Sequence, residues 1–519
     1  MAFVGRSYSL RFVQDDAYIT YRYARNVVRG AGPVFNTGER VEGYTNFLWM
    51  MLLAALGIVG VPFTTIIPLS QVLGVLCGIG VIIIFFLLIR RHSRGPPLVA
   101  PLATWLLAAN GSFAYWCVSG MESALFALLC AAAFYVFLGT TGARRMVGSS
   151  LLLGLAALTR PEGVLFFGVV GLYFVLSRII RDRGAVLNRA NLGDLARLAV
   201  PFLIIVAPLY AWRLGYYGWF FPNTFYAKTG FAITYLKSGI DYFVAYMRAY
   251  GFFGLGLLLP LFVALRWRRR MDSGPFLFAL LAIAIHAVYT IGVGGDVLRI
   301  YRFFVPVYLL YYFVLSESIW LIPAPAFLRT VLVLAVAVLS FWGPLAKGNT
   351  VRADILRNRY LEKGLVDKMS VTGRWLNRNL TEQDWFAGTT IGAVSYFSDR
   401  NMIDMLGLTD AVVAHHPENI LGPRVYWKER NYNTAHVLER LPQYIYFSTG
   451  GKPSAAAERA LFLRTRFRRG YFACLVSMQE RAQMLGGVCS VQSQPGQGTR
   501  VEVSIPLSAL SNIKEGIRL

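Results

Sequence analysis

Long apolar runs separated by short basic clusters form the main pattern of this chain. A helix needs about 20 largely apolar residues to cross a bilayer, and fewer where a surrounding bundle shields its ends. On this basis we predict ten membrane-spanning helices, at residues 63–89, 97–115, 122–139, 147–159, 163–177, 197–212, 250–266, 275–293, 302–317 and 327–343. The chain is therefore expected to be an all-α polytopic membrane bundle.

Basic clusters follow every second apolar run. They are Arg90-Arg91-His92-Ser93-Arg94, Arg144-Arg145, residues 178–183 and residues 266–270. Because Lys and Arg accumulate in cytoplasmic loops, all four clusters are expected to face the cytoplasm. The remaining connections, which carry the polar motifs of the chain, then face outward.

The short apolar run at residues 46–60 precedes the first predicted span. If this run crossed the membrane, the segment before it, which contains Asp15 and Asp16, would face the cytoplasm. We therefore interpret the run as an interfacial helix anchored by Tyr44 and Trp49. Ten spans place both chain ends outside. Residues 1–14 contain no apolar segment, so we expect that a first membrane helix, preceding Met1, is missing from the chain.

Composition agrees with this class. Apolar residues make up 56% of the chain and charged residues 15%, against roughly 25% charged in soluble domains. The net charge of +24 comes from clusters between apolar runs, which favours lipid headgroups over nucleic acid. The five cysteines form no CxxC pair, so neither a disulfide framework nor a zinc site is indicated.

The apolar density falls after residue 350, where a helix at 368–380 and strands at 389–393, 401–405 and 443–448 predict a small α/β domain. The expected organisation has four parts. These are an external loop with interfacial helices (1–62), the transmembrane bundle (63–345), the extracytoplasmic α/β domain (346–473) and a tail (474–519).

Asp15 and Asp16 begin the first outward segment, where Tyr18, Arg22 and Arg25 recur at helical spacing. One carboxylate could take a proton from a sugar hydroxyl while the arginines hold a lipid phosphate. An Asp at this position could equally cap the helix that follows it. The sequence leaves both interpretations open.

Two further outward segments fit the S/T-x-x-E capping box, ending at Glu122 and Glu162, which favours a structural role for both. Arg160 is different, because a cation in the first turn opposes the helix dipole. It could bind an anion together with the free N–H groups of that turn.

Aromatic residues surround Asn223, Tyr226 and Lys228, a mixture that suits stacking on sugar rings and pairing with phosphate. An aromatic belt at the membrane interface explains the tyrosines equally well, but not Asn223 and Lys228. His286 lies within a predicted span, where we favour a role in the core.

Asp296 follows two glycines and could belong only to a tight turn. Arg299 and Arg302 come directly after it, at the outer lip of the bundle, which indicates an anionic headgroup site. Asp404 and Asp410 precede His415-His416, but these residues lack the spacing of metal ligands. The sequence indicates no definite cofactor, and a divalent cation can be neither claimed nor excluded.

In combination these motifs resemble the GT-C superfamily of polyprenyl-phosphate-dependent membrane glycosyltransferases, in particular the branch that includes the actinobacterial terminal arabinofuranosyltransferase. The resemblance covers roughly residues 12–450. It rests on Asp15-Asp16-Ala17-Tyr18-Ile19, Val34-Phe35-Asn36, residues 38–46, Ser119-Gly120-Met121-Glu122, residues 159–163, residues 222–228, Gly294-Gly295-Asp296 and residues 403–410.

The resemblance implies an inverting transfer of a sugar, in this branch arabinofuranose, from a polyprenyl-phosphate donor to a cell-envelope glycan or lipid acceptor. Transfer would take place at the outer face of the bacterial cytoplasmic membrane, in cell-wall biogenesis. Asp15 or Asp16 would deprotonate the acceptor hydroxyl. The donor phosphate would be bound by Arg22, Arg25, Arg160, Lys228, Arg299 and Arg302, and the sugar or acceptor by Tyr18, Glu122, Asn223, Tyr226, Asp296, Asp404 and Asp410.

Residues 478–507 resemble the last helix and strands of a sensor histidine kinase ATP-binding domain. This fragment lacks the helix and glycine-rich loop that would hold nucleotide, so we expect no ATP binding and interpret it as a fusion scar. A membrane sensor kinase is therefore disfavoured.

A lipid-linked sugar transporter or flippase would also have many spans and outward-facing arginines. Such a protein needs polar groups accessible from both leaflets, whereas the polar motifs of this chain gather on one side. The sequence thus favours the transferase over the flippase. An inactive truncated paralogue of the transferase also stays open.

Overall fold

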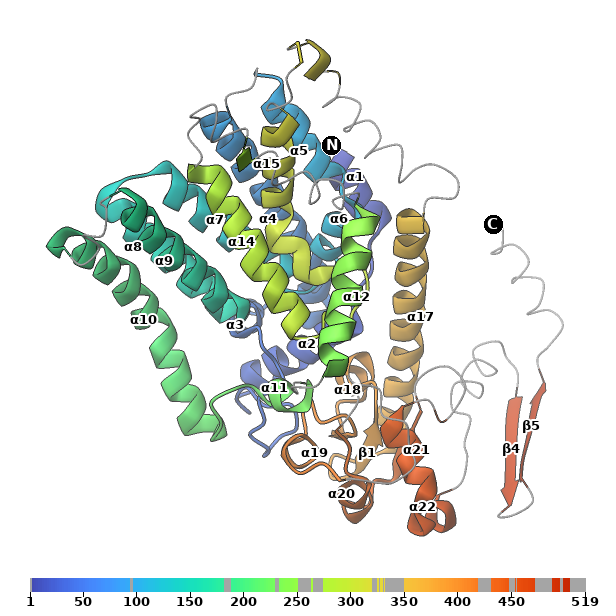
Figure 1. The fold of residues 1–519 in the computed structure, drawn as a ribbon. Helices are drawn as coiled ribbons and strands as arrows, with labels where there is room; N and C mark the ends of the chain where they lie inside the picture. The colour runs from blue at the N-terminus through green and yellow to red at the C-terminus, as the bar shows by residue number, and fades with distance from the viewer. Residues whose placement is uncertain are drawn as a thin grey trace. The chain divides into compact units, whose positions relative to one another are not determined.

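The computed structural model describes residues 2–93, 97–181, 188–228, 233–250, 263–264, 274–319, 324–325, 327–329, 331, 350–418, 431–447, 453, 455–471, 488–494 and 498–504. The described chain is predominantly helical, which confirms the predicted class (Figure 1). Contacts divide it into two compact units. The helical unit comprises residues 1–14, 45–220 and 229–362, and the α/β unit comprises residues 15–44, 221–228 and 363–519.

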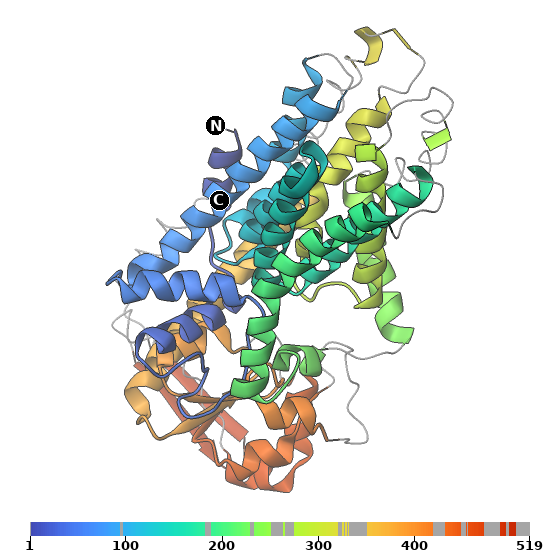
Figure 2. The ribbon, with the colours of Figure 1, turned by 90° about the vertical axis from the view of Figure 1, so that its left-hand side faces the viewer.

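The helical unit is a bundle in which α7 packs against α4 and α8, and α8 packs against α10 (Figures 1 and 2). Its elements are α1 (Ala2–Ser9), α3 (Phe47–Ile58), α4 (Phe63–His92), α5 (Val99–Ala109), α6 (Gly111–Cys117), α7 (Ser123–Gly139), α8 (Gly142–Thr159), α9 (Glu162–Arg181), α10 (Arg189–Tyr217), α12 (Ile233–Ala249), α14 (Gly274–Gly292), the 3₁₀ helix η1 (Arg302–Val307) and α15 (Tyr308–Ile319).

Five of the described segments are long and apolar enough to cross a membrane: Phe63–His92, Glu162–Ile180, Arg189–Tyr217, Gly274–Gly292 and Arg302–Ile319. The chain is a multi-pass membrane protein. Most of the predicted spans at 250–266 and 327–343 lies outside the described residues.

The predicted span at 97–115 is not one helix. It is divided at Asn110, whose side-chain oxygen accepts a hydrogen bond from the Phe113 N–H (2.8 Å) and so caps α6. An apolar pattern cannot reveal this break, because both flanking segments are equally apolar. The helix expected at 46–60 is confirmed as α3, whereas α1 was not expected.

Close packing of α4 against α6 requires glycine at position 74. A Cβ atom built there would lie 2.2 Å from the backbone oxygen of Cys117. Nearby, the side-chain amide of Gln71 donates to the carbonyl oxygens of Phe12 (2.6 Å) and Val118 (2.9 Å). These contacts fix α4 against the segment that follows α1 and the residue that follows α6.

The α/β unit is built around a three-stranded parallel sheet with the order β2-β1-β3. Its elements are α2 (Asp15–Val28), α11 (Asn223–Lys228), the second half of α17 (Thr350–Asn379), β1 (Trp385–Gly388), α18 (Gly392–Ser398), β2 (Asn401–Asp404), α19 (Ala411–His415), α20 (Thr434–Glu439), β3 (Tyr444–Tyr446), α21 (Ala456–Leu463), α22 (Thr465–Gly470), β4 (Val488–Gln494) and β5 (Gly498–Ser504).

The helix predicted at 368–380 and the strands predicted at 401–405 and 443–448 are confirmed in α17, β2 and β3. The strand predicted at 389–393 is wrong. The strand ends at Gly388, and α18 has begun by Gly392, whose N–H is bound by a distant carboxylate rather than by a neighbouring strand.

The described part of the tail is an antiparallel hairpin of β4 and β5. The helix expected before it lies outside the described residues. The four-part domain division stays a prediction. The contacts differ from it in grouping residues 15–44 and 221–228 with 363–519.

Replacing Gly74 with Ala should lower the stability of the helical unit by about 1–3 kcal/mol, because the added methyl group overlaps a backbone atom that cannot rotate away. The matched control is Gly168→Ala in α9, where a Cβ atom meets nothing within 4 Å. Thermal unfolding in detergent measures both, and equal melting temperatures for the two variants would contradict this packing.

Candidate active site

The two adjacent aspartates at the start of α2 occupy different environments. Asp15 is buried, and its carboxylate accepts hydrogen bonds from the backbone N–H groups of Gly392 (3.1 Å) and Ala393 (2.9 Å). Only glycine fits at 392, since a Cβ atom there would lie 2.0 Å from the Asp15 backbone oxygen. Asp15 is therefore a helix cap, but for α18 rather than for its own helix.

Burial raises the pKa of Asp15 to about 7. The two N–H donors lower this pKa, and the negative charge of Asp16 raises it. Asp16 is half-buried, and its side chain makes no hydrogen bond or ion pair with any of the described residues. The pair thus consists of one anchored carboxyl group and one carboxylate whose oxygens no described group occupies.

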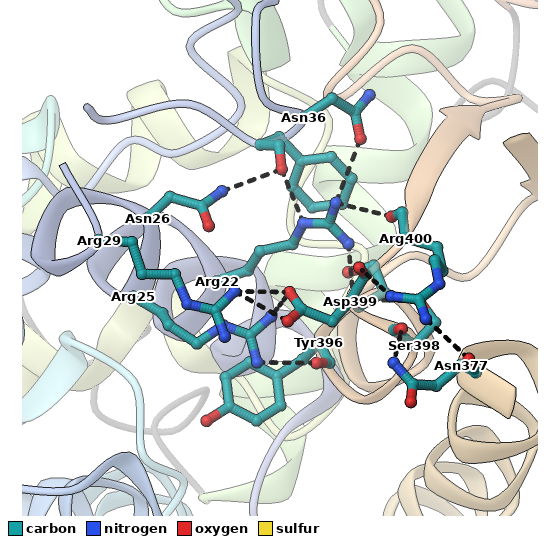
Figure 3. Close-up of polar contacts among 12 residues, drawn as sticks. Arg22, Arg25, Asn26, Arg29, Asn36, Asn377, Tyr396, Ser398, Asp399 and Arg400 are labelled. Carbon is teal, nitrogen blue, oxygen red and sulfur yellow. Dashed lines mark hydrogen bonds and ion pairs between the residues drawn. The ribbon is translucent and has the colours of Figure 1, made fainter. Parts of the chain in front are cut away.

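Arg22 lies further along α2 and is buried among oxygen atoms of the protein (Figure 3). Its guanidinium donates to the carbonyl oxygens of Phe35 (2.7 Å), Ser395 (2.6 Å) and Arg400 (2.8 Å), and to the side chain of Asn36 (3.3 Å). Burial lowers the pKa of Arg22 to about 9. Four of its five N–H bonds are occupied, so this arginine ties α2 to α18 instead of facing a ligand.

Figure 3 also shows Arg25 and Arg29 turned toward Asp399. Their guanidinium nitrogens lie 2.7 and 2.8 Å from its carboxylate oxygens. The Arg25 guanidinium lies 4.3 Å from the centre of the Tyr396 ring, and the Tyr18 ring packs against the same tyrosine. Burial raises the pKa of Asp399, but the two arginines outweigh it and hold that pKa below its usual value. Burial raises the pKa of Tyr18 to about 12.

Asn223 begins α11 and fastens it within the α/β unit. Its amide donates to the carbonyl oxygens of Gly407 (2.7 Å) and Asp410 (3.1 Å), and its N–H donates to Glu42 (2.9 Å). Tyr226 follows on the same helix, with its ring 4.3 Å from that of His415, and Lys228 is the last residue of α11. The Asn223 side chain therefore binds backbone oxygens of the α/β unit rather than facing an open surface.

Asp404 and Asp410 organise the turn after β2. Asp404 accepts from the N–H groups of Leu406 (2.9 Å) and Thr409 (2.8 Å), and burial raises its pKa to about 6. Asp410 caps α19, and its second oxygen lies 3.0 Å from His436. Within the described parts of the chain, no three His, Cys, Asp or Glu side chains could together hold a metal ion.

A separate polar cluster lies in the helical unit, around Arg160. Its guanidinium binds Glu122 (2.6 Å) and Glu162 (2.8 Å), and Glu122 also accepts from Asn46 (2.9 Å). The capping-box interpretation is therefore wrong for Glu122, which makes no side-chain cap for α7. The two glutamates hold the arginine instead.

Asp296 and Arg302 form a second ion pair next to this cluster, with two N–O contacts of 2.8 and 3.1 Å. Arg160 and Arg302 lie 5.7 and 5.9 Å from the centre of the same ring, that of Phe303. The cavity that these side chains line has a volume of about 10 Å³, enough for a single water molecule. Carboxylates, and not an open anion site, surround both arginines.

Arg299 differs from the other predicted phosphate ligands. It is exposed and has no partner among the residues that the structure describes. Sequence reasoning gave no role to several residues that complete these clusters, namely Asn36, Gly392, Asp399 and Arg400. Only proximity in the fold identifies them.

The fold is similar to those of solved structures that share little sequence with this chain. The structure is similar to that of ArnT from Cupriavidus metallidurans, with a TM-score of 0.50 and 16% identity, over 79% of this chain and 86% of ArnT. ArnT bound to undecaprenyl phosphate gives a TM-score of 0.51 and 14% identity, over 79% and 87%.

Two curated relatives share more of their sequence with this chain than the solved structures do. The chain is 28% identical over 330 residues to the terminal beta-(1->2)-arabinofuranosyltransferase of Corynebacterium glutamicum, covering 55% of this chain and 45% of that protein. It is 28% identical over 284 residues to the enzyme of the same name from Mycobacterium tuberculosis, covering 51% and 43%. The chain therefore spans less than half the length of these relatives. Residues 356–491 match a family described as a domain of unknown function, DUF8728.

The pKa of Asp15 predicts how stability depends on pH. Because this pKa is higher in the folded protein (about 7) than the ordinary value of 3.8, the folded state binds more protons between these pH values. The contribution of Asp15 to stability should therefore be greatest at low pH and fall by a few kcal/mol as pH rises from about 4 to about 7.

Asp15→Asn removes this titration. Melting temperatures at pH 5 and pH 8 should show a larger decrease in the wild type than in Asp15→Asn. Asp404, whose pKa is also raised, is present in both proteins and cancels from the comparison. An identical change in both proteins would contradict the raised pKa.

Proposed function

We propose that this chain is an inverting glycosyltransferase that moves a sugar, arabinofuranose by similarity to its relatives, from a polyprenyl-phosphate donor to a glycan or lipid acceptor. The proposed place of transfer is the outer face of a bacterial cytoplasmic membrane. The observation that carries this proposal is the free carboxylate of Asp16 beside the anchored Asp15, in a chain whose curated relatives are terminal arabinofuranosyltransferases.

Asp16 is the proposed base, because it is half-buried and no group of the described protein occupies its oxygens. It takes the proton of the acceptor hydroxyl, and the hydroxyl oxygen forms a new bond to the anomeric carbon of the sugar. The bond from that carbon to the phosphate oxygen breaks, and polyprenyl phosphate leaves with the bonding electrons. Attack from the opposite face inverts the configuration.

Asp15 is the proposed positioning residue. Its hydrogen bonds to Gly392 and Ala393 hold the start of α2 against α18, which fixes where the Asp16 side chain begins. The neighbouring Asp16 raises the pKa of Asp15, because a nearby negative charge disfavours ionisation of the buried carboxyl group.

The proposed phosphate ligands are fewer than the sequence indicated. Arg22, Arg25, Arg160 and Arg302 already bind carboxylates or backbone oxygens, which supports a structural role. Arg299 and Lys228 stay proposed phosphate ligands, and Glu122, Tyr226 and Asp296 stay proposed ligands of the sugar or the acceptor.

Asp16→Asn should lower sugar transfer by about 10²–10⁴-fold, because the amide cannot take the hydroxyl proton. Transfer of labelled arabinofuranose from a polyprenyl phosphate to an arabinan oligosaccharide, with membranes containing equal amounts of each variant, measures this. Asp15→Asn is the matched control, and its smaller loss should be accompanied by a change in melting temperature.

Two outcomes would count against this assignment. Unchanged transfer by Asp16→Asn would exclude Asp16 as the base. Loss of transfer in Asp15→Asn with wild-type stability, while Asp16→Asn remains active, would make Asp15 the base instead.

A further inference from the structure

The short helix α11 has an exposed aromatic side and a buried side. Phe221, just before the helix, and Phe225 are 37% and 39% exposed, and their rings stack with centroids 4.3 Å apart. The stacking shows that the two rings lie on the same side. Asn223 and Ala227 are both buried and, four residues apart, share the other side of the helix.

The buried side fastens α11 to the α/β unit. The Asn223 amide donates to the carbonyl oxygens of Gly407 and Asp410. The side-chain amide of Asn431 donates to the Tyr226 carbonyl oxygen (3.2 Å). All of these residues belong to the α/β unit. The phenylalanine rings therefore stay on the outer side, because turning the helix would break these hydrogen bonds.

Chain continuity keeps this aromatic side close to a membrane boundary. α10 is long and apolar enough to cross a bilayer, and residues 218–222 connect its end to α11. Even fully extended, this connection spans at most about 20 Å. The 29 residues of α10 have a length of about 44 Å, close to the roughly 40–45 Å of a bilayer with its headgroups. A crossing helix of that length ends at the level of the headgroups, which α11 can reach.

The end of α10 has the composition of a membrane interface. The rings of Trp212, Tyr216 and Tyr217 contact one another with centroid distances of 4.8–5.5 Å. Trp219 and Phe220 follow and are 42% and 48% exposed. Tryptophan and tyrosine concentrate where the hydrocarbon of a bilayer meets its headgroups, and exposed phenylalanine inserts at the same depth. The aromatic side of α11 continues this series.

A saccharide is the other ligand that exposed aromatic rings could bind. Sugars stack on the faces of aromatic rings, but Phe221 and Phe225 turn one face toward each other. Neither side chain has a hydroxyl or amide group to bind the hydroxyl groups of a sugar. Lipid requires no such hydrogen bonds, so the aromatic side of α11 fits lipid better than glycan.

We propose that Phe221 and Phe225 insert into the bilayer where headgroups meet acyl chains, and so anchor the α/β unit to the membrane surface. Asp16, the proposed base, belongs to the same unit, so this anchor limits how far it can move from the bilayer. The lipid contact itself does not require the proposed function.

Photocrosslinking of the full chain in phospholipid nanodiscs tests this proposal. The label is introduced as Phe225→p-benzoylphenylalanine. The matched control is the same replacement of Phe462, which lies in α21 of the same unit and is 41% exposed. Phospholipid adducts, measured by mass spectrometry, should be roughly tenfold more abundant at position 225. Transfer of about half a phenylalanine side chain from water to lipid is favoured by about that factor.

The other outcomes would overturn the proposal. Equal yields of phospholipid adducts at positions 225 and 462 would show that α11 has no preferred contact with lipid. In native membranes, adducts at position 225 mainly with saccharide would assign the aromatic side to a glycan, and adducts mainly with a second copy of the chain would assign it to an oligomer interface.

The result is independent of sugar transfer. Adding Asp16→Asn to the labelled chain should leave the phospholipid adducts at position 225 unchanged. Unchanged transfer by Asp16→Asn would therefore count against the proposed base and not against the membrane contact. A label at position 221 should give the same excess of phospholipid adducts over position 462, and its absence there would contradict insertion of both rings.

Discussion

The α/β unit depends on the contact between the Asp15 carboxylate and the first N–H groups of α18. This contact joins residues that are 377 and 378 positions apart in the chain. Arg22 and Arg25 reinforce it, since both reach from α2 to carbonyl oxygens of α18. The loop that follows α2 supplies further partners, since Arg22 donates to Phe35 and Asn26 to Val34. The contacts with α18, in contrast, can form only after the chain between the two helices has been made.

The apolar pattern predicted the helices well because burial in lipid demands long uninterrupted runs of apolar residues. It failed where one polar side chain decides the local conformation. Asn110 splits an apolar run by capping α6, and Gly392 begins a helix where β propensity suggested a strand. In both places a polar side chain accepts hydrogen bonds from backbone N–H groups at the start of a helix, which hydropathy does not record.

The sequence indicated which charged residues are candidates for the site, but not which of them form ion pairs with one another. The sequence left Asp15 open between a catalytic base and a helix cap, assigned Glu122 to a capping box, and set Arg160 apart because a cation in a first turn opposes the helix dipole. The sequence could not show that Glu122 and Glu162 form ion pairs with the same arginine. Nor could it show that Asp399 forms ion pairs with two arginines. Pairing depends on distances between helices, and one sequence without a fold contains no such distances.

The cluster around Phe303 has an electrostatic consequence. Glu122, Glu162 and Asp296 supply three negative charges, whereas Arg160 and Arg302 supply two positive ones. The group as a whole therefore carries one surplus negative charge in a largely buried position. Such a surplus repels an anion and attracts the positive end of an O–H dipole, such as that of the single water molecule for which the cavity has room.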